Sequence, residues 1–229
     1  MNLHCLHGFL GSGEDFNFLK KGISLFGKKP EIDWNCSLQD FGQRYNNYVR
    51  HISTKNNILI GYSLGGRLAL HSLIHDESLY KGAVIISSHI GLSCPLEKQK
   101  RLHDDQVRSE KLKVCFKTFV KEWDELTIFK GSPEMQRNED QLDIEALCHS
   151  LRVWSLGKQR CLLNAVENIS IPLLFVAGEY DQTYKAIAEK LVLKHPQSRV
   201  WIAKECGHRV PWQSQKKFIE NVHHFIQSL

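Results

Sequence analysis

Short apolar runs and amphipathic stretches alternate along most of the chain. Runs of about 4–8 mainly apolar residues, bounded by polar or turn-forming residues, are typical of strands that are buried on both faces of a sheet. The sequence places such runs at residues 3–6, 57–61, 82–87, 171–178 and 200–203, with a weaker one at 30–34. We interpret each of them as a strand of one sheet.

Helical periodicity occupies the segments between these runs. Residues 38–53 carry apolar side chains at the three- and four-residue spacing that lines one face of a helix. Further helices are expected at 16–26, 67–75, 185–194 and 213–227. Strands that alternate with helices in this way predict an α/β protein with a doubly wound, mostly parallel sheet that is flanked by helices.

The stretch from residue 89 to residue 168 has a different character. It is charged and helical in pattern, and it contains no apolar run comparable to those on either side. We therefore expect a helical cap at 89–168, inserted into a core that consists of residues 1–88 and 169–229. With 229 residues, the chain is long enough for one such domain with a substantial core.

Charge and hydropathy exclude some classes of partner. The chain has 30 Lys and Arg against 25 Asp and Glu, and the net charge of +5 is too small to predict nucleic-acid binding. No apolar run approaches the roughly 18–20 residues of a membrane span. The N-terminus lacks the basic region of a signal peptide. We expect a cytoplasmic protein, a monomer or weak homo-oligomer, that binds neither nucleic acid nor membrane.

Basic residues gather between Lys98 and Lys121, with acidic residues interspersed. This pattern fits a solvated helix surface, and it also fits a binding surface for an anionic small molecule or an acidic carrier. The two interpretations stay open at this point.

The seven cysteines form no Cys-x-x-Cys pair, and the sequence has no His-Glu-x-x-His pattern. We therefore expect no disulfide framework, no metal and no cofactor. Cys5, Cys115 and Cys161 lie among apolar neighbours and are expected to be buried thiols.

The sequence Gly61-Tyr62-Ser63-Leu64-Gly65 follows the apolar run at 57–61 and precedes a helix. By itself a Gly-x-Ser-x-Gly pattern is a modest signal, because glycine and serine are common in turns. A serine hydroxyl becomes reactive only when a histidine accepts its proton and a carboxylate orients that histidine. The chain must therefore supply both partners.

Asp181 follows the run at 171–178, and His208 follows the run at 200–203. The chain order Ser63, Asp181, His208, with each residue after a strand, is that of the α/β-hydrolase fold. We predict these three residues as catalytic, and Glu179 remains the alternative acid.

A reaction through an oxyanion needs two fixed N–H donors beside the serine. One is expected from the backbone of Leu64 at the start of the helix. The other is expected from Phe9 in the turn His7-Gly8-Phe9-Leu10-Gly11, which follows the first strand.

The segments His7-Gly8-Phe9-Leu10-Gly11-Ser12, Gly61-Tyr62-Ser63-Leu64-Gly65-Gly66-Arg67 and Gly178-Glu179-Tyr180-Asp181 resemble the α/β-hydrolase superfamily. Within it, the chain is most similar to the 2-succinyl-6-hydroxy-2,4-cyclohexadiene-1-carboxylate synthases of menaquinone biosynthesis. The narrower likeness rests on four features of the expected cap: Ser88-His89-Ile90-Gly91-Leu92, the Arg-x-x-x-Asp spacing of Arg101 and Asp105, Trp123, and Ser155-Leu156-Gly157-Lys158-Gln159.

The resemblance implies an unusual use of the three catalytic residues. In that family the serine–histidine pair acts as a base, and pyruvate is eliminated so that a cyclohexadiene ring remains. The substrate is a polycarboxylate, which makes Arg67 and Arg101 candidates for binding its carboxylates, with Arg108 a weaker one. By the same resemblance, Tyr62 and Trp123 line the substrate pocket.

Two departures from the superfamily pattern leave the substrate open. The usual Asp-x-Pro-Gly-His-Gly is absent at residues 32–37, and the chain starts at what would be the third strand of the full sheet. The alternative function is a serine carboxylesterase or thioesterase, which would act on a carrier-bound acyl substrate and use the same three residues. A ligand-binding relative without catalysis is disfavoured, because all three residues are present.

Overall fold

A parallel sheet is the frame of the molecule. The computed structural model describes residues 1–19, 24–26, 36–52 and 55–229. In this part of the chain six strands form one sheet in the order β2-β1-β3-β4-β5-β6, and each pair of neighbours is parallel. The strands are β1 (Asn2–Leu6), β2 (Ser24–Phe26), β3 (Asn57–Tyr62), β4 (Tyr80–Ile86), β5 (Leu173–Gly178) and β6 (Arg199–Ala203). Their carboxyl ends consequently meet at one edge.

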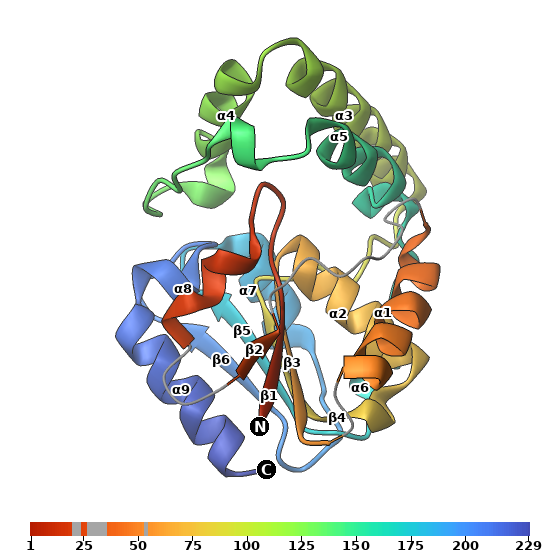
Figure 1. Ribbon diagram of the computed structural model, residues 1–229, viewed down its shortest axis with the longest axis vertical. Helices are drawn as coiled ribbons and strands as arrows, with labels where there is room; N and C mark the ends of the chain where they lie inside the picture. The colour runs from red at the N-terminus through yellow and green to blue at the C-terminus, as the bar shows by residue number, and fades with distance from the viewer. Residues whose placement is uncertain (20–23, 27–35, 53–54) are drawn as a thin grey trace.

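Helices cover both faces of the sheet (Figure 1). Alternate strand residues point to opposite faces, so Ile85 packs with α1, α2 and α7, whereas Val84 packs with α8 and α9. The helices around the sheet are α1 (Leu38–Ile52), α2 (Leu64–His75), α6 (Leu163–Glu167), α7 (Gln182–Lys190), α8 (Val210–Gln213) and α9 (Gln215–Gln227). This sandwich fixes the strand ends that carry the predicted catalytic residues.

Between β4 and β5 the described chain forms helices and no strand. Helices α3 (Pro95–Val114), α4 (Phe116–Asp124) and α5 (Ile144–Val153) lie over the carboxyl edge of the sheet (Figure 1). They share their own apolar cluster, into which Leu10 inserts from the turn after β1. Helix α6 packs with the sheet-side cluster through Val166 instead. The turn after β1 therefore joins the sheet to the helices above it.

Most of the expected elements are confirmed. The five stronger apolar runs are strands, and the helices expected at 38–53, 67–75, 185–194 and 213–227 are present with shifted ends. The single helix expected at 16–26 is wrong: Gly13–Leu19 forms a 3-10 helix, and Ser24–Phe26 pairs with β1. Pairing with a neighbouring strand overrides local propensity in so short a segment. The weak strand expected at 30–34 lies outside the described residues.

The cysteine prediction holds for one of the three residues named. Cys5 is buried, whereas Cys115 and Cys161 are exposed, so the prediction for these two is wrong. Cys115 lies at the junction of α3 and α4, where Leu112 and Phe116 take the inward positions. Apolar neighbours in the sequence therefore did not make the side chains of Cys115 and Cys161 part of the buried core.

The turns after β5 and β6 lie against each other at Gly178, the last residue of β5. A Cβ at this position would lie 2.0 Å from the carbonyl oxygen of Gly207 and 2.4 Å from that of Cys206. The Tyr180 N–H also donates to the Cys206 carbonyl oxygen at 2.8 Å. Glycine at this position thus allows the turn that carries Asp181 to lie directly against the turn before His208.

We expect Gly178→Ala to lower the free energy of unfolding by about 1–3 kcal/mol, because the added methyl group must push two backbone segments apart. Urea denaturation measures this loss. Gly131→Ala is the control, since φ is 76° there but nothing lies within 4 Å of the added Cβ. It should lose about 1–2 kcal/mol from its left-handed backbone alone, and a Gly178→Ala protein as stable as wild type would contradict the close packing of the two turns.

Candidate active site

Ser63 occupies a sharp turn between β3 and α2. Its backbone has φ 53° and ψ −112°, which is strained for a residue with a side chain. The Ser63 N–H donates to the Ile86 carbonyl oxygen at 2.9 Å, and the Ser88 hydroxyl donates to the Ser63 carbonyl oxygen at 3.2 Å. Gly65 allows α2 to start against β1, since a Cβ there would lie 2.1 Å from the Leu6 carbonyl oxygen. These contacts hold Ser63 in the wall of a cavity at the carboxyl edge of the sheet.

His208 links Ser63 to Asp181. Its Nε2 lies 3.0 Å from Ser63 Oγ, and its Nδ1 lies 2.6 Å from Asp181 Oδ2. Because the carboxylate accepts the Nδ1 proton, Nε2 keeps a lone pair and accepts the Ser63 hydroxyl proton. Glu179, the alternative acid, instead accepts the backbone N–H of Glu205 at 2.9 Å. The structure therefore brings the three predicted catalytic residues together.

Aromatic rings surround the His208 imidazole. The ring centroids of Tyr62, Phe129 and Tyr184 lie 5.5, 5.4 and 4.6 Å from that of His208. The Tyr62 ring also contacts the Trp212 ring, with 4.8 Å between centroids. Tyr62 is buried and is not among the described residues that line the cavity. The ring of Tyr62 thus packs against that of His208, and its place at the substrate pocket stays a prediction from the family resemblance.

The two expected oxyanion donors border the same cavity as Ser63. Phe9 lies in the turn after β1, which is closed by a hydrogen bond of 3.0 Å from the Gly11 N–H to the Gly8 carbonyl oxygen. Strand β1 pairs with β3 up to Leu6 and Gly61, so this turn lies beside the one that holds Ser63. Leu64 is the first residue of α2, and the first N–H groups of a helix have no acceptor within the helix.

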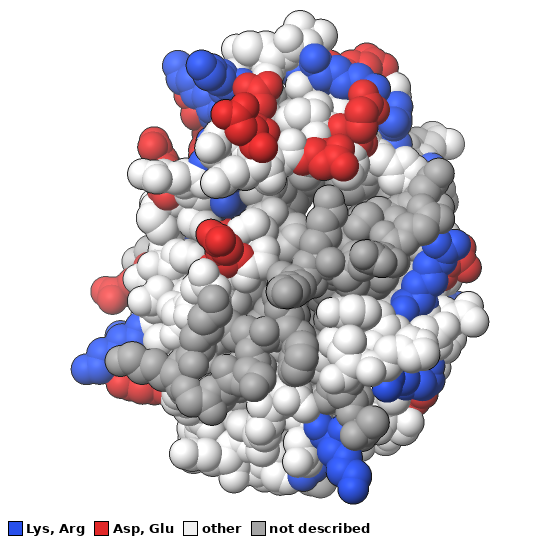
Figure 2. Space-filling model, viewed as in Figure 1, with Lys and Arg blue, Asp and Glu red and all other residues white. Residues whose placement is uncertain are grey.

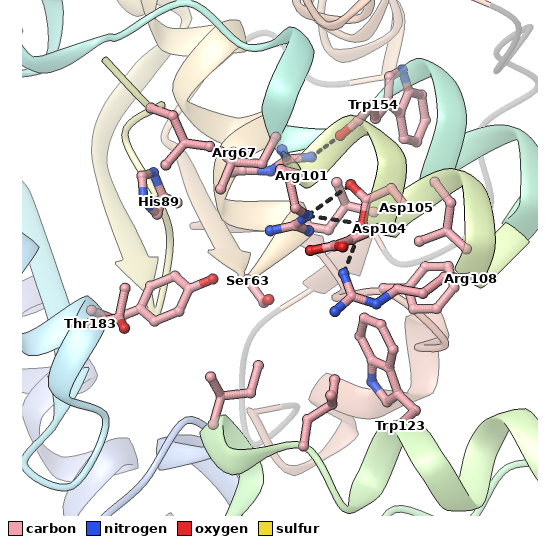
Figure 3. Close-up of a pocket in the computed structure, with 18 of the residues that line it drawn as sticks. Ser63, Arg67, His89, Arg101, Asp104, Asp105, Arg108, Trp123, Trp154 and Thr183 are labelled. Atoms are coloured by element: carbon pink, nitrogen blue, oxygen red, sulfur yellow. Dashed lines mark hydrogen bonds and ion pairs between the residues drawn. The ribbon is translucent and has the colours of Figure 1, made fainter. Parts of the chain in front are cut away.

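The cavity has a volume of about 480 Å³ and lies between the sheet and the helices above it. Ser63, Leu64 and Phe9 line it from the side of the sheet, and Trp123 lines it from α4. Figure 3 labels Ser63 and Trp123 at this cavity. Trp123 also packs on Phe9, with 4.8 Å between ring centroids. A volume in this range suits one small organic molecule.

Arg67 reaches this cavity from α2. The side chain is buried, and Nη2 donates to the Trp154 carbonyl oxygen. Nη1 has no hydrogen-bond partner among the described residues. Burial, and next the charge of Arg101, lower the pKa of Arg67 to about 10, so the guanidinium stays charged at neutral pH. A buried cationic N–H without an acceptor favours an anionic ligand beside it.

Asp105 positions two further arginines at the cavity. Its buried carboxylate accepts Arg101 Nε at 2.9 and 2.8 Å, and it accepts Arg108 Nη1 at 2.9 Å. The Ser155 hydroxyl donates to it at 2.7 Å. Figure 3 shows both guanidinium groups beside the cavity, held from the same carboxylate. The sequence shows the Arg-x-x-x-Asp spacing of Arg101 and Asp105, but Asp105 was not predicted as a site residue.

The basic cluster of residues 98–121 divides between two environments. Lysines on the outer surface pair with acidic neighbours, as in Lys111 with Glu122 at 2.7 Å and Lys113 with Glu145 at 2.9 Å. Figure 2 accordingly shows side chains of both signs next to each other over the cap helices. Arg101 and Arg108 line the cavity instead. Each of the two earlier interpretations therefore describes part of the cluster.

His89 and Tyr184 also line the cavity, although the sequence did not predict either as a cavity residue. The position of His89 directly after the apolar run at 82–87 was a usable signal, because residues at strand ends collect at one edge. Tyr184 depends on the rotation of α7 about its axis, which the sequence pattern leaves open. Within the described part of the chain, no three His, Cys, Asp or Glu side chains are grouped as a metal site requires.

None of the helices in the described ranges is both long and apolar enough to cross a membrane.

The sequence resembles several proteins that share one enzyme name. A protein of Bacillus subtilis (strain 168), named as a candidate 2-succinyl-6-hydroxy-2,4-cyclohexadiene-1-carboxylate synthase, is 28% identical and covers 98% of this chain and 90% of its own. The synthase of that name from Pectobacterium atrosepticum is 26% identical, over 98% of this chain and 93% of its own.

The fold also matches a solved structure. The structure of MenH from S. aureus superposes with a TM-score of 0.87 at 21% identity, and it covers 100% of this chain and 94% of its own. The sequence pattern of the Alpha/beta hydrolase family matches residues 5–221. That match spans nearly the whole length, and the chain belongs to the alpha/beta hydrolase family.

Proposed function

We propose that this protein is a 2-succinyl-6-hydroxy-2,4-cyclohexadiene-1-carboxylate synthase, a lyase of menaquinone biosynthesis that eliminates pyruvate from a polycarboxylate cyclohexene. The observation that carries the proposal is one cavity that is lined by Ser63 together with Arg67 and Arg101 (Figure 3). The proposed base and the proposed anion-binding groups therefore line the same cavity. The names of the sequence relatives support the same activity.

In this proposal Ser63, His208 and Asp181 act together as a base. His208 Nε2 accepts the proton of the Ser63 hydroxyl, and the serine oxygen takes a proton from the substrate ring. The electron pair of that C–H bond forms a ring double bond, the existing ring double bond shifts, and the C–O bond to the leaving group breaks. The enolpyruvate that departs takes up a proton on carbon and becomes pyruvate, and the protonated His208 gives up its proton to restore the base. Asp181 holds the imidazole and stabilises its protonated form. The step adds no water and forms no acyl-enzyme.

The backbone N–H groups of Phe9 and Leu64 stabilise the negative charge that develops on a substrate oxygen during proton removal. Fixed donors serve this purpose well, because they need no reorganisation as the charge forms. Trp123 supplies the apolar wall on the opposite side of the cavity.

The cationic groups bind the substrate carboxylates. Arg67 offers Nη1, which lacks a partner among the described residues. Arg101 contacts Asp105 through Nε, which leaves its two Nη groups for a carboxylate. Tyr62, whose ring packs on that of His208, borders the bound substrate beside Ser63.

Residues 89–168 form the cap of this enzyme in the same proposal, and the protein works in the cytoplasm as a monomer or weak homo-oligomer. Its ligand is an anionic small molecule, and it needs no cofactor.

The second candidate is a serine carboxylesterase or thioesterase. Its candidate substrates include acyl groups bound to a carrier. The strained backbone of Ser63 and the 3.0 Å contact to His208 Nε2 favour it, because both also suit a nucleophilic serine. The three arginines that line the cavity favour the elimination, since neutral esters have no carboxylates for them to bind.

A substrate panel separates the two activities. We expect the wild-type protein to release pyruvate from the menaquinone intermediate, with the absorbance of the ring product rising in parallel, and to turn over p-nitrophenyl esters negligibly. Pyruvate is measured by a coupled dehydrogenase assay. Fast hydrolysis of short-chain esters without pyruvate release would reject the elimination and support the esterase.

Ser63→Ala and His208→Ala should each lower kcat by roughly 10³-fold or more, because either change removes one half of the base. Ser132→Ala is the matched control, since its hydroxyl bonds Gln213 and it is not among the described cavity residues. Pyruvate release under substrate saturation measures the effect. Near-normal rates in either of the first two variants would refute the role of the Ser63–His208 pair.

Arg101→Gln should lower kcat/KM for the polycarboxylate about 10–100-fold, since it removes a charge-assisted hydrogen bond to a carboxylate. Lys113→Gln is the control for net charge, because Lys113 lies on the same helix and pairs with Glu145 on the surface. Steady-state kinetics compare kcat/KM for the polycarboxylate between the two variants. Equal losses would show that overall charge, and not a contact in the cavity, attracts the substrate.

A further inference from the structure

His89 lies in the cavity wall beside the arginines, on the loop that follows β4. Figure 3 shows its ring on the same side of the cavity as Arg67, across from Arg108. The mechanism above does not use this side chain. Its two ring nitrogens have different surroundings, and this difference defines what the ring can do.

The Nδ1 atom of His89 accepts a hydrogen bond from the backbone. The Gly91 N–H donates to His89 Nδ1 at 2.9 Å, so Nδ1 carries the lone pair. Gly91 has φ +104°, and a Cβ there would lie 2.2 Å from the Arg160 carbonyl oxygen. Gln159 Nε2 donates to the His89 carbonyl oxygen at 3.2 Å, and the Leu162 N–H donates to the Ile90 carbonyl oxygen. The loop is therefore pressed against residues 159–162, and the ring has a fixed orientation.

A neutral imidazole with its lone pair on Nδ1 carries its proton on Nε2. Burial, and next the charges of Arg67 and Arg101, lower the pKa of His89 to about 4. The edge of the ring also contacts Tyr184, with centroids 6.1 Å apart and planes at 88°. At neutral pH the ring therefore offers an uncharged N–H donor.

No described residue accepts a hydrogen bond from this Nε2–H, and Nε2 is not among the fully buried atoms that lack a partner. It is therefore the open end of a residue that lines the cavity. We propose that His89 donates a hydrogen bond from Nε2 to a carbonyl or carboxylate oxygen of the bound polycarboxylate, next to the groups held by Arg67 and Arg101. This inference rests on the proposed function for the identity of the substrate.

An uncharged donor adds selectivity that the arginines do not supply. Cationic groups attract any small anion, whereas a fixed N–H donor beside them favours a ligand with an oxygen at one defined point. A ligand without that oxygen leaves the donor unpaired, which weakens its binding.

Two substitutions at His89 separate the ligand role from a structural one. In His89→Asn, the side-chain oxygen replaces Nδ1 as the acceptor for Gly91, but nothing reaches the position of Nε2. In His89→Gln, the amide nitrogen reaches that position, but the acceptor for Gly91 is lost. A residue that only anchors the loop would make Asn the milder change, whereas the proposed contact makes Gln the milder one.

We expect His89→Asn to lower kcat/KM for the polycarboxylate roughly 10–100-fold, mainly through KM, and His89→Gln to stay within about fivefold of wild type. Thermal unfolding should place His89→Asn within a few degrees of wild type. The reverse order of the two variants, or a His89→Asn protein that does not fold, would overturn the proposal.

A binding measurement decides the same question without turnover. Calorimetric titration with 2-oxoglutarate, a dicarboxylate that also carries a ketone oxygen, should show weaker affinity for His89→Asn than for wild type and for His89→Gln. If the wild-type protein releases no pyruvate, the proposed function fails, yet this titration still tests His89. Equal affinities, or no binding to the wild type, would reject the contact.

Discussion

The site depends on one short buried contact, the 2.6 Å hydrogen bond between His208 Nδ1 and Asp181 Oδ2. It selects the tautomer whose Nε2 accepts from Ser63, and it orients the imidazole toward that serine. The contact exists because β5 and β6 are neighbours whose turns meet at Gly178. A register shift or a bulkier residue at this point would separate acid from base. The parallel sheet thus sets the distance between Asp181 and His208, because it fixes the spacing of the two turns that carry them.

The cavity distributes charge unevenly around that contact. Asp105 accepts hydrogen bonds from Arg101 and Arg108, and therefore fixes their direction and offsets part of their charge. Arg67 has no carboxylate partner in the described structure, and its Nη1 lacks an acceptor. An anionic ligand would complete this arrangement, whereas a neutral ester would leave it unsatisfied. Charge in the cavity, rather than the identity of the three predicted catalytic residues, distinguishes the two candidate functions.

The sequence predicted the elements that local pattern determines. The continuous apolar runs at 57–61 and 171–178 can be buried on both faces only in a covered sheet, and the turns after them had to gather at one edge. The prediction from the sequence failed where tertiary contacts determine the structure, as in the strand pairing of Ser24–Phe26. The same contrast between local pattern and tertiary contacts separates the site residues that were predicted from those that were not. Ser63 carries a signature in its turn, but Asp105 and His89 gain their partners from distant segments, Ser155 and Gln159.

The cap is connected to the base through the residue after His208. Arg209 donates to the carboxylate of Asp124 and to the Pro133 carbonyl oxygen, and its guanidinium lies 4.2 Å from the centroid of the Phe129 ring. Phe129 in turn contacts the His208 ring. Any displacement of this part of the cap would therefore disturb the packing of the imidazole as well as the cavity wall. The proposed elimination would gain from this connection, because the arginines that bind carboxylates and the predicted base then keep one relative position.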